Sequence, residues 1–194
     1  MALSYGFFNS LNGDRKYDAE QMSRIFDGII NDGVFDSVGN MFAVSPVSGM
    51  RIKVAPGRAW FNSTWTYNDA DLPLTLVDAD VTMGRYDAVV LEVNNNDEVR
   101  ANSIKVVTGS PSTKPIKPKM TNDNGVHQYP LAYILVGAGE TEVRAAAIEN
   151  AVGTSECPFV TGILKTVNID SLFSEWNGQF LEWLANLQIQ LSGD

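Results

Sequence analysis

The sequence predicts a mainly β protein: an antiparallel β-sandwich with an N-terminal helix and a C-terminal coiled-coil-like helix. Apolar and polar residues alternate with a period of two through much of the stretch from about residue 40 to 162. Turn-forming residues separate these stretches, and charged residues make up only 19% of a chain that is 44% hydrophobic. We therefore divide the 194 residues into an aromatic arm and helix (1–33), a sandwich (34–165) and an oligomerisation helix (166–194).

The N-terminal part combines an aromatic arm at residues 1–17 with a helix over residues 18–31. Asp18 is a suitable N-cap, and Gln21, three positions later, completes a capping box. Gly33 is expected to end the helix in a left-handed conformation. The apolar residues that repeat at helical spacing are Met22, Ile25, Phe26, Ile29 and Ile30.

The middle of the chain contains the predicted strands. Residues 50–54 alternate strictly, and Pro73 places the alternating residues 72–76 at a sheet edge. A tight turn at Ser63-Thr64 joins two further strands. An ion pair between Arg85 and Asp87 is expected, because residues i and i+2 lie on one face of a strand. The other predicted strands are residues 58–62, 65–68, 86–93, 99–101, 104–107 and 129–136, with a short helical turn at 145–148.

Large apolar residues in the last segment follow a heptad pattern that is typical of helices that associate with other helices. Asn168 or Asp170 caps this helix, and Gly178 is the one residue that weakens it, by about 1 kcal/mol. We expect a homo-oligomer, with a trimer preferred. The predicted oligomerisation residues are Ile169, Phe173, Trp176, Phe180, Trp183 and Leu187.

Catalytic chemistry is poorly represented in the sequence. The chain has one histidine, His127, and one cysteine, Cys157, so triads, Cys-His pairs and His-based metal sites would all depend on these two residues. The Gly137-Ala138-Gly139 segment lacks the third glycine of a phosphate-binding loop. We therefore expect no enzymatic activity, no catalytic residues, no cofactor and no bound metal.

Charge and hydropathy restrict the partners. A net charge of −9 disfavours nucleic-acid binding. No apolar run is long enough to span a membrane, and no signal peptide is evident, so synthesis in the cytoplasm without membrane insertion is expected.

Two sets of side chains leave a binding function open. Paired acids such as Asp69 with Asp71, Asp78 with Asp80, and Asp97 with Glu98 are interpreted as turn residues, with a weak calcium site as the alternative. The aromatic residues on two adjacent strands favour core packing, with a sugar-binding platform as the alternative. These aromatic residues are Trp60, Phe61, Trp65 and Tyr67. The candidate glycan contacts are Trp65, Tyr67, Asn68 and Asp69.

Residues 84–93 read Gly-Arg-Tyr-Asp-Ala-Val-Val-Leu-Glu-Val, which resembles a motif of tailed-phage structural proteins. The N-terminal residues 6–10 and 13–17 resemble the start of the same family. The remaining matching positions, in order, are Arg100, Ile104, Gly109, Pro115, Pro118, Tyr129, Leu131, Ala132, Ile148, Asn150 and the Cys-Pro-Phe-Val-Thr-Gly run at 157–162.

The resemblance covers nearly the whole chain. It implies an upper-baseplate or tail-fibre N-terminal module of a siphophage, or of a prophage, with a Gram-positive host. Such a module is a structural virion protein of the tail or baseplate that joins the tail to host-attachment parts. Other tail or baseplate proteins are the implied partners. A carbohydrate-binding module that contacts host cell-surface glycans is the alternative function.

Overall fold

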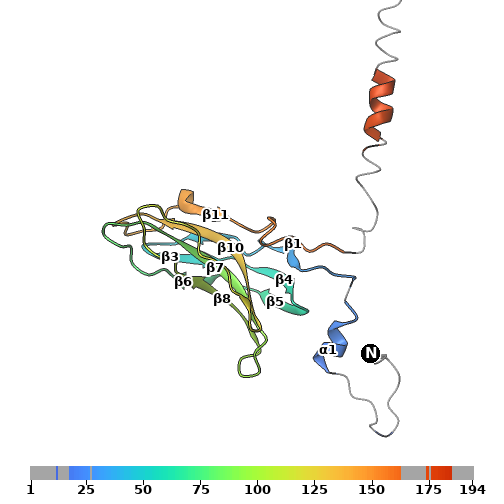
Figure 1. Ribbon diagram of the computed structural model, residues 1–194, viewed down its shortest axis with the longest axis horizontal. Coiled ribbons are helices and arrows are strands. Elements are labelled where there is room, and N and C mark those ends of the chain that lie inside the picture. Colours follow the sequence, from blue (N-terminus) through green and yellow to red (C-terminus); the bar gives the residue numbers. More distant parts are fainter. Residues whose placement is uncertain (1–11, 13–17, 27, 163–173, 175, 185–194) are drawn as a thin grey trace, which may run out of the picture. The chain divides into compact units, whose positions relative to one another are not determined.

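The computed structural model describes residue 12 and residues 18–26, 28–162, 174 and 176–184. The chain divides into two units, Met1–Val160 and Thr161–Asp194. Most of the predicted aromatic arm at 1–17 lies outside the described residues, as do Asn168 and Asp170, the proposed caps of the last helix. The described part of the first unit is mainly β, as predicted, and its sheets are antiparallel (Figure 1).

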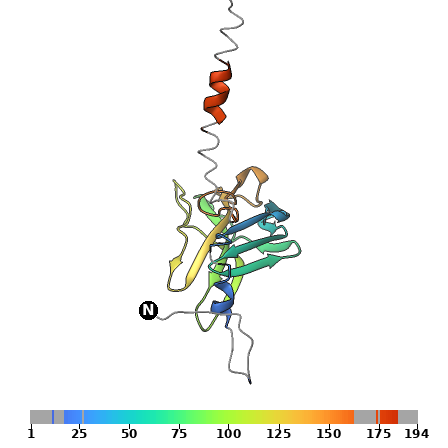
Figure 2. The same ribbon diagram turned by 90° about the vertical axis from the view of Figure 1, so that its right-hand side faces the viewer.

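The described strands form three sheets. The largest has five strands in the order β11-β10-β7-β8, with β9 paired to β10, and the two smaller sheets are β1-β4-β5 and β2-β3-β6. In Figure 1, β3 and β6 lie toward one end of the unit and β4 and β5 toward the other, while Figure 2 shows β1, β4 and β5 (blue to teal) beside the larger sheet. The strands are β1 (Gly33–Gly39), β2 (Val44–Pro46), β3 (Arg51–Val54), β4 (Gly57–Phe61), β5 (Thr64–Asn68), β6 (Leu72–Thr75), β7 (Arg85–Asn94), β8 (Ala101–Val107), β9 (Asn122–Asp123), β10 (Val126–Val136) and β11 (Ile148–Asn150).

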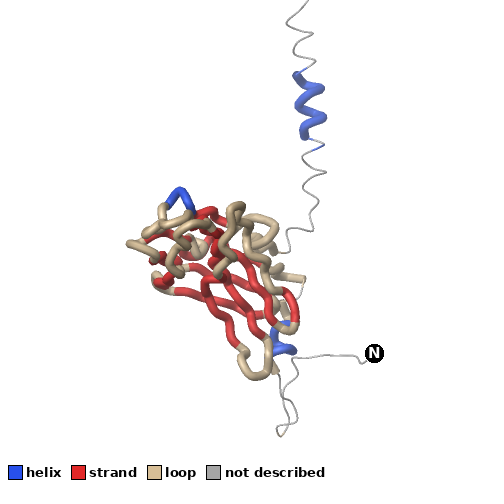
Figure 3. The backbone as a smooth tube through the Cα atoms, turned by 60° about the vertical axis from the view of Figure 1, so that its left-hand side comes forward, coloured by secondary structure: helices blue, strands red, loops and turns tan. Residues whose placement is uncertain are grey.

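One hydrophobic core draws side chains from all three sheets. Phe42, Phe61, Ile52, Leu91 and Leu131 are among its largest fully buried members. Strand β7 is buried along almost its whole length, which explains why residues 88–91 are apolar without alternation. Figure 3 shows the loops gathered mainly at the ends of the strands, leaving the middle of the unit to the sheets.

Strand β10 contains a proline in the interior of the five-stranded sheet. The register between β7 and β10 shifts between Pro130 and Ala132, so that Leu131 is left out of the pairing with β7. Proline has no N–H to donate, and a bulge is the usual way in which a paired strand accommodates it. The Leu131 carbonyl instead accepts a hydrogen bond from the Ala151 N–H, which extends the contact toward β11.

The predicted N-terminal helix is much shorter than expected. The capping box forms, since the Gln21 N–H donates to Asp18 Oδ1 at 2.8 Å and the Asp18 N–H donates to Gln21 Oε1 at 3.2 Å. However, α1 covers only Ala19–Ser23, and turns follow it. Its predicted apolar face does not enter the core, which leaves little packing to stabilise a longer helix: Met22, Phe26 and Ile29 are all exposed.

The prediction that Gly33 ends this helix in a left-handed conformation was also wrong. Gly28 adopts the left-handed conformation, with φ of 77°, whereas Gly33 begins β1. A Cβ at Gly33 would lie 2.4 Å from the backbone carbon of Phe159, so this glycine permits close contact with the backbone of residues 158–160. The short helical turn expected at 145–148 is confirmed as a 3-10 turn, η1, at Ala145–Ala147.

The second unit contains a helix at residues 176–184. Ile169, Phe173 and Leu187 lie outside the described residues, so only the central part of the predicted heptad pattern is described. The association of this helix with other copies stays a prediction. None of the helices in the described ranges has the length and apolar content of a membrane-spanning segment.

Candidate functional site: an aromatic face beside Arg58

The outer face of the β1-β4-β5 sheet carries two exposed aromatic side chains. Trp65 is 65% exposed and Tyr67 is 58% exposed, whereas Thr64, Thr66 and Asn68, which alternate with them on β5, are half-buried. Core packing was the favoured prediction for these aromatics, and for Trp65 and Tyr67 it is wrong.

Strand register explains the outward position. Trp60 pairs with Trp65 and Arg58 pairs with Tyr67, and residues directly opposite one another share a face of the sheet. Ala59 and Phe61 alternate with Arg58 and Trp60 and are buried in the core. The partners of Arg58 and Trp60 must therefore point outward.

The fourth aromatic residue, Phe61, does pack in the core as predicted. Its ring stacks on Tyr129 with 3.8 Å between the centroids, and it is 1% exposed. The Tyr129 hydroxyl donates to Asn62 Oδ1 at 2.6 Å. Burial, together with the nearby Asp32 carboxylate, raises the pKa of Tyr129 to about 12, so this hydroxyl stays protonated at neutral pH.

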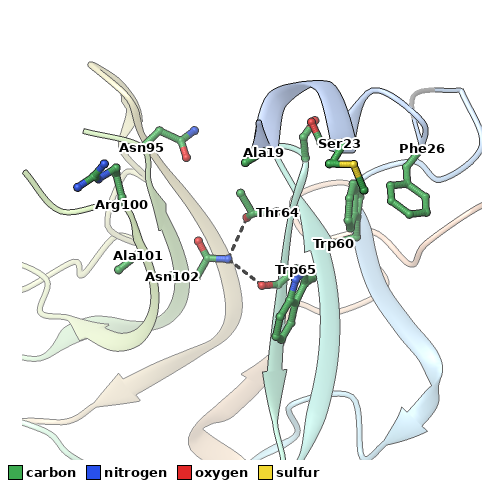
Figure 4. A pocket seen from close by; sticks show the side chains of 12 residues that line it. Ala19, Ser23, Phe26, Trp60, Thr64, Trp65, Asn95, Arg100, Ala101 and Asn102 are labelled. Carbon is green, nitrogen blue, oxygen red and sulfur yellow. Dashed lines mark hydrogen bonds between the residues drawn. The ribbon is translucent and has the colours of Figure 1, made fainter. Parts of the chain in front are cut away.

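One side of Trp65 borders a groove with a volume of about 640 Å³ (Figure 4). Its walls come from α1, the β4–β5 hairpin and the β7–β8 hairpin. Phe26 packs edge-on against Trp60, with 5.3 Å between the ring centroids, and both residues line the groove. In Figure 4, Asn95 and Asn102 point toward this groove, while the guanidinium of Arg100 points away from α1.

Asn102 links the two sheets that form the groove. Its amide nitrogen on β8 donates to Thr64 Oγ1 at 2.9 Å, to Thr66 Oγ1 at 2.8 Å and to the Trp65 carbonyl at 3.2 Å. The acceptors all lie on β5, so this single side chain fixes the position of the strand that carries the exposed aromatics.

The other side of Trp65 borders a second, smaller hollow. Val38, Arg58, Trp65 and Tyr67 line this Arg58 hollow, which has a volume of about 380 Å³. The Arg58 guanidinium carbon lies 5.2 Å from the centre of the Phe35 ring, a cation–π distance. Within the described residues, Arg58 forms no ion pair and no hydrogen bond through its side chain. Its N–H donors are therefore available to a ligand.

Only half of the predicted glycan contacts belong to this hollow. The Asn68 amide donates to the carbonyls of Ala55 at 3.1 Å and Val54 at 3.4 Å, so it holds the neighbouring chain segment. Asp69 follows β5 and is exposed, but it does not line the hollow. Sequence reasoning missed Arg58 and Val38. Hairpin register would have identified Arg58, because a two-residue turn at 62–63 places it opposite Tyr67.

Buried charged residues elsewhere hold the fold together. The predicted Arg85–Asp87 ion pair is confirmed, with Nε to Oδ1 at 2.9 Å and Nη2 to Oδ2 at 3.2 Å. Arg85 also donates to the carbonyls of Asp78, at 2.8 Å, and Val77. Asp87 accepts a further bond from the Gly109 N–H at 3.0 Å. The pair thus ties β7 to two loops, and its hydrogen-bonding capacity is used within the protein.

A second buried acid, Glu92, is similarly engaged. Lys105 Nζ lies 2.6 Å from Glu92 Oε2, and the Gln128 amide donates to the same oxygen at 2.7 Å. Burial opposes ionisation of Glu92, but the bonds from Lys105 and Gln128 outweigh it and lower its pKa. These contacts join β7, β8 and β10.

The remaining candidates from the sequence are dispersed. Cys157 is fully buried, and burial raises the pKa of its thiol to about 12, which keeps it protonated and unreactive. His127 lies in β10, paired with Val93 and Asn122. Asp80 accepts bonds from the Thr82 and Met83 N–H groups, which lower its pKa, so its role is in a turn, as interpreted from the sequence. No three metal-ligating side chains gather among the described residues.

The described helix of the second unit, taken by itself, has large apolar side chains on its surface. Trp176 is 71% exposed, Phe180 55% and Trp183 56%, and the Phe180 and Trp183 rings lie 5.9 Å apart. Leu181 and Leu184 are also exposed. The large apolar side chains of the described helix are therefore mostly exposed.

Comparison with known proteins gives no assignment. No protein-family model matches the chain, and no curated protein and no solved structure shows significant similarity to it.

Proposed function

We propose that the protein is a structural component of a phage tail or baseplate that connects the tail to host-attachment parts. The observation that carries this proposal is the apolar surface of the terminal helix, with Trp176, Phe180 and Trp183 each more than half exposed. Leaving large aromatic rings in water is unfavourable, and we expect partner chains in an assembly to cover this surface.

The chemistry of the first unit supports a non-enzymatic role. Asp87 and Glu92 are the buried acids of the described core, and both make bonds within the sheets that hold the fold. Enzyme active sites instead direct such groups into a cleft, where they reach a substrate. The assignment to a phage tail rests on the sequence motif at residues 84–93 and the ordered positions around it.

The test is the location of the protein in virions. Particles are purified from a strain that carries the gene, and antibodies against the first unit are used in immunogold electron microscopy. We expect gold at the distal end of the tail and the intact chain in the particle proteome. Particles that lack the chain would contradict the proposal.

A second function, glycan binding, is favoured by the exposure of Trp65 and Tyr67. Aromatic rings on a rigid sheet offer a large apolar surface at little entropic cost, which suits the C–H face of a sugar ring. This function would allow the same protein to contact the host surface directly.

An oligosaccharide array tests this function. We expect the full chain to bind a subset of glycans and the Trp65→Ala variant to lose this binding. Val81, which is 84% exposed and is not among the residues that line the hollow, provides the control Val81→Ala. Equal binding by both variants would contradict a role for the aromatic face.

A further inference from the structure

We infer that the Arg58 hollow binds the negatively charged group of an acidic glycan, with the carboxylate or phosphate at Arg58 and the sugar ring on Trp65 and Tyr67. This inference rests on the proposed glycan binding. It goes further by naming the chemical class of the ligand and the residue that selects it.

The Arg58 guanidinium has no hydrogen-bond acceptor of its own among the described residues. Its neighbour on one side is the Phe35 ring, which holds the guanidinium by a cation–π contact at 5.2 Å and supplies no acceptor. By contrast, Lys53, Arg85, Lys105, Lys117 and Arg144 all have a carboxylate partner. Arg58 thus lines a hollow with Trp65 and Tyr67, and no carboxylate among the described residues neutralises its charge.

A second feature is the composition of the hollow. An arginine fork binds carboxylate or phosphate through two parallel hydrogen bonds, which a lysine cannot reproduce. Trp65 and Tyr67 stand beside it on the same face, because Tyr67 pairs directly with Arg58 and Trp65 lies two residues before Tyr67 on β5. A ligand here meets one cation and two aromatic surfaces. Sugars with an anionic substituent have the matching combination of an apolar ring face and a single negative charge.

A third feature is rigidity. Strand β5 is held from behind by the three bonds of Asn102 and by the bonds of Asn68 to Val54 and Ala55. Strand β4 is fixed by the burial of Ala59 and Phe61. The binding residues therefore lie on sheet strands whose inner sides are packed, which limits the entropy lost when a ligand binds.

The experiment uses the labelled full-length chain on an array of glycans printed in matched pairs. Each pair consists of an oligosaccharide with a carboxylate or phosphate group and its neutral counterpart. We expect binding to favour the acidic member by roughly tenfold, as a charge-assisted hydrogen bond provides. We also expect Arg58→Gln to remove this preference. Separate carboxylate and phosphate sets show which anion is the natural one.

Three further variants make the result specific. Arg58→Lys keeps the charge but not the fork and should retain only part of the preference. Arg51→Gln removes an exposed arginine from β3, in another sheet, and should change nothing. Trp65→Ala should lose binding to both members of a pair. Urea unfolding of each variant verifies that it is folded.

The outcomes separate the two levels of the proposal. Equal binding of acidic and neutral glycans, or an unchanged preference in Arg58→Gln, overturns the acidic-ligand inference and leaves glycan binding intact. The absence of binding to every glycan on the array overturns both the acidic-ligand inference and the proposed glycan binding.

Discussion

At the scale of single residues, the stability of the fold depends on charges that the sheet encloses. Arg85 is 3% exposed and Asp87 is fully buried, and each residue neutralises the charge of the other. Removing one partner leaves a buried charge without its counter-ion, which costs about 3–5 kcal/mol. We therefore expect Arg85→Met to lower the free energy of unfolding by about that amount in urea titration.

The exposed ion pair between Lys53 and Asp71 provides the matched control. Its atoms are 2.6 Å apart, but its side chains are 42% and 50% exposed. Water screens such a pair, so Lys53→Met should change the free energy of unfolding by no more than about 1 kcal/mol. Similar effects of the two substitutions would show that burial does not determine the contribution of Arg85.

Glu92 makes stability dependent on pH. The bonds from Lys105 and Gln128 hold its pKa below the ordinary value of 4.5 despite burial. A carboxyl group with a lowered folded-state pKa binds protons more readily in the unfolded chain. The contribution of Glu92 to the free energy of unfolding is therefore fully present above pH 4.5, and it is lost as the pH falls through the lower folded-state pKa.

The variant Glu92→Gln has no carboxyl group at this position to titrate. We expect it to be less stable than the natural protein at pH 7 and the difference to narrow as the pH falls from 5 toward 3, because protonation removes the advantage of the acid. Chemical denaturation at a series of pH values measures this. A difference that is independent of pH over this range would refute the assignment.

At the scale of secondary-structure elements, the β4–β5 hairpin positions the candidate site. Its turn residues Asn62 and Ser63 have φ of 50° and 59°, the left-handed region that two-residue hairpin turns require. Asparagine tolerates this conformation, but serine pays a steric penalty that glycine avoids. We expect Ser63→Gly to raise the free energy of unfolding by about 0.5–1 kcal/mol.

The same substitution within a strand should have the opposite effect. Ser37 is exposed in β1 and is not among the residues with positive φ. There, glycine only adds conformational freedom to the unfolded chain, so Ser37→Gly should lower stability by about 0.5–1 kcal/mol. Urea unfolding of the pair measures both values. A loss of stability in Ser63→Gly would mean that strain at the turn is negligible.

Elements with strong periodicity could be predicted from the sequence, and the exceptions have physical causes. The predicted strand at 86–93 is β7 within a residue at each end, because its apolar run can only be buried inside a sheet. Within the predicted helix at 18–31 only α1 is helical, because the apolar side chains of this range do not enter the core. Local pattern identifies an amphipathic face but not whether another element covers it.

The candidate site was half predictable for a similar reason. Alternation along β5 separates Trp65 and Tyr67 from Thr64 and Thr66, but it does not say which set faces inward. Aromatic residues are usually the buried set, which led to the wrong choice. The decision is made by the partner strand, where Phe61 is buried and the turn pairs it with Thr64. Long-range register therefore exposes the aromatics, against their own hydrophobicity.

At the scale of the whole molecule, the chain combines a unit with its own core and a second unit of a different kind. The first unit encloses a large hydrophobic cluster shared by three sheets. The described helix of the second unit has no buried residue. A single helix of this size is marginal in water, so its stability depends on what its apolar side chains contact.

Self-association through this helix is therefore our prediction for the full chain. A buried Trp or Phe removes about 150–250 Å² from water, at about 25 cal/mol per Å². Trp176, Phe180 and Trp183 follow one another at the four- and three-residue spacing of a heptad seam, which suits packing between helices. Light scattering at micromolar concentration should give a multiple of the chain mass, with a trimer preferred.

Two altered chains test the role of the helix. A version that ends at Thr166 removes the seam, and a full-length version with Trp176, Phe180 and Trp183 changed to Ser keeps the length but not the apolar surface. Both should scatter as monomers or aggregate, because the contacts between copies are lost. The control changes Asn177 and Gln179, exposed residues off the seam, to Ser and should keep the oligomer. A natural chain that is monomeric at micromolar concentration would contradict self-association through this helix.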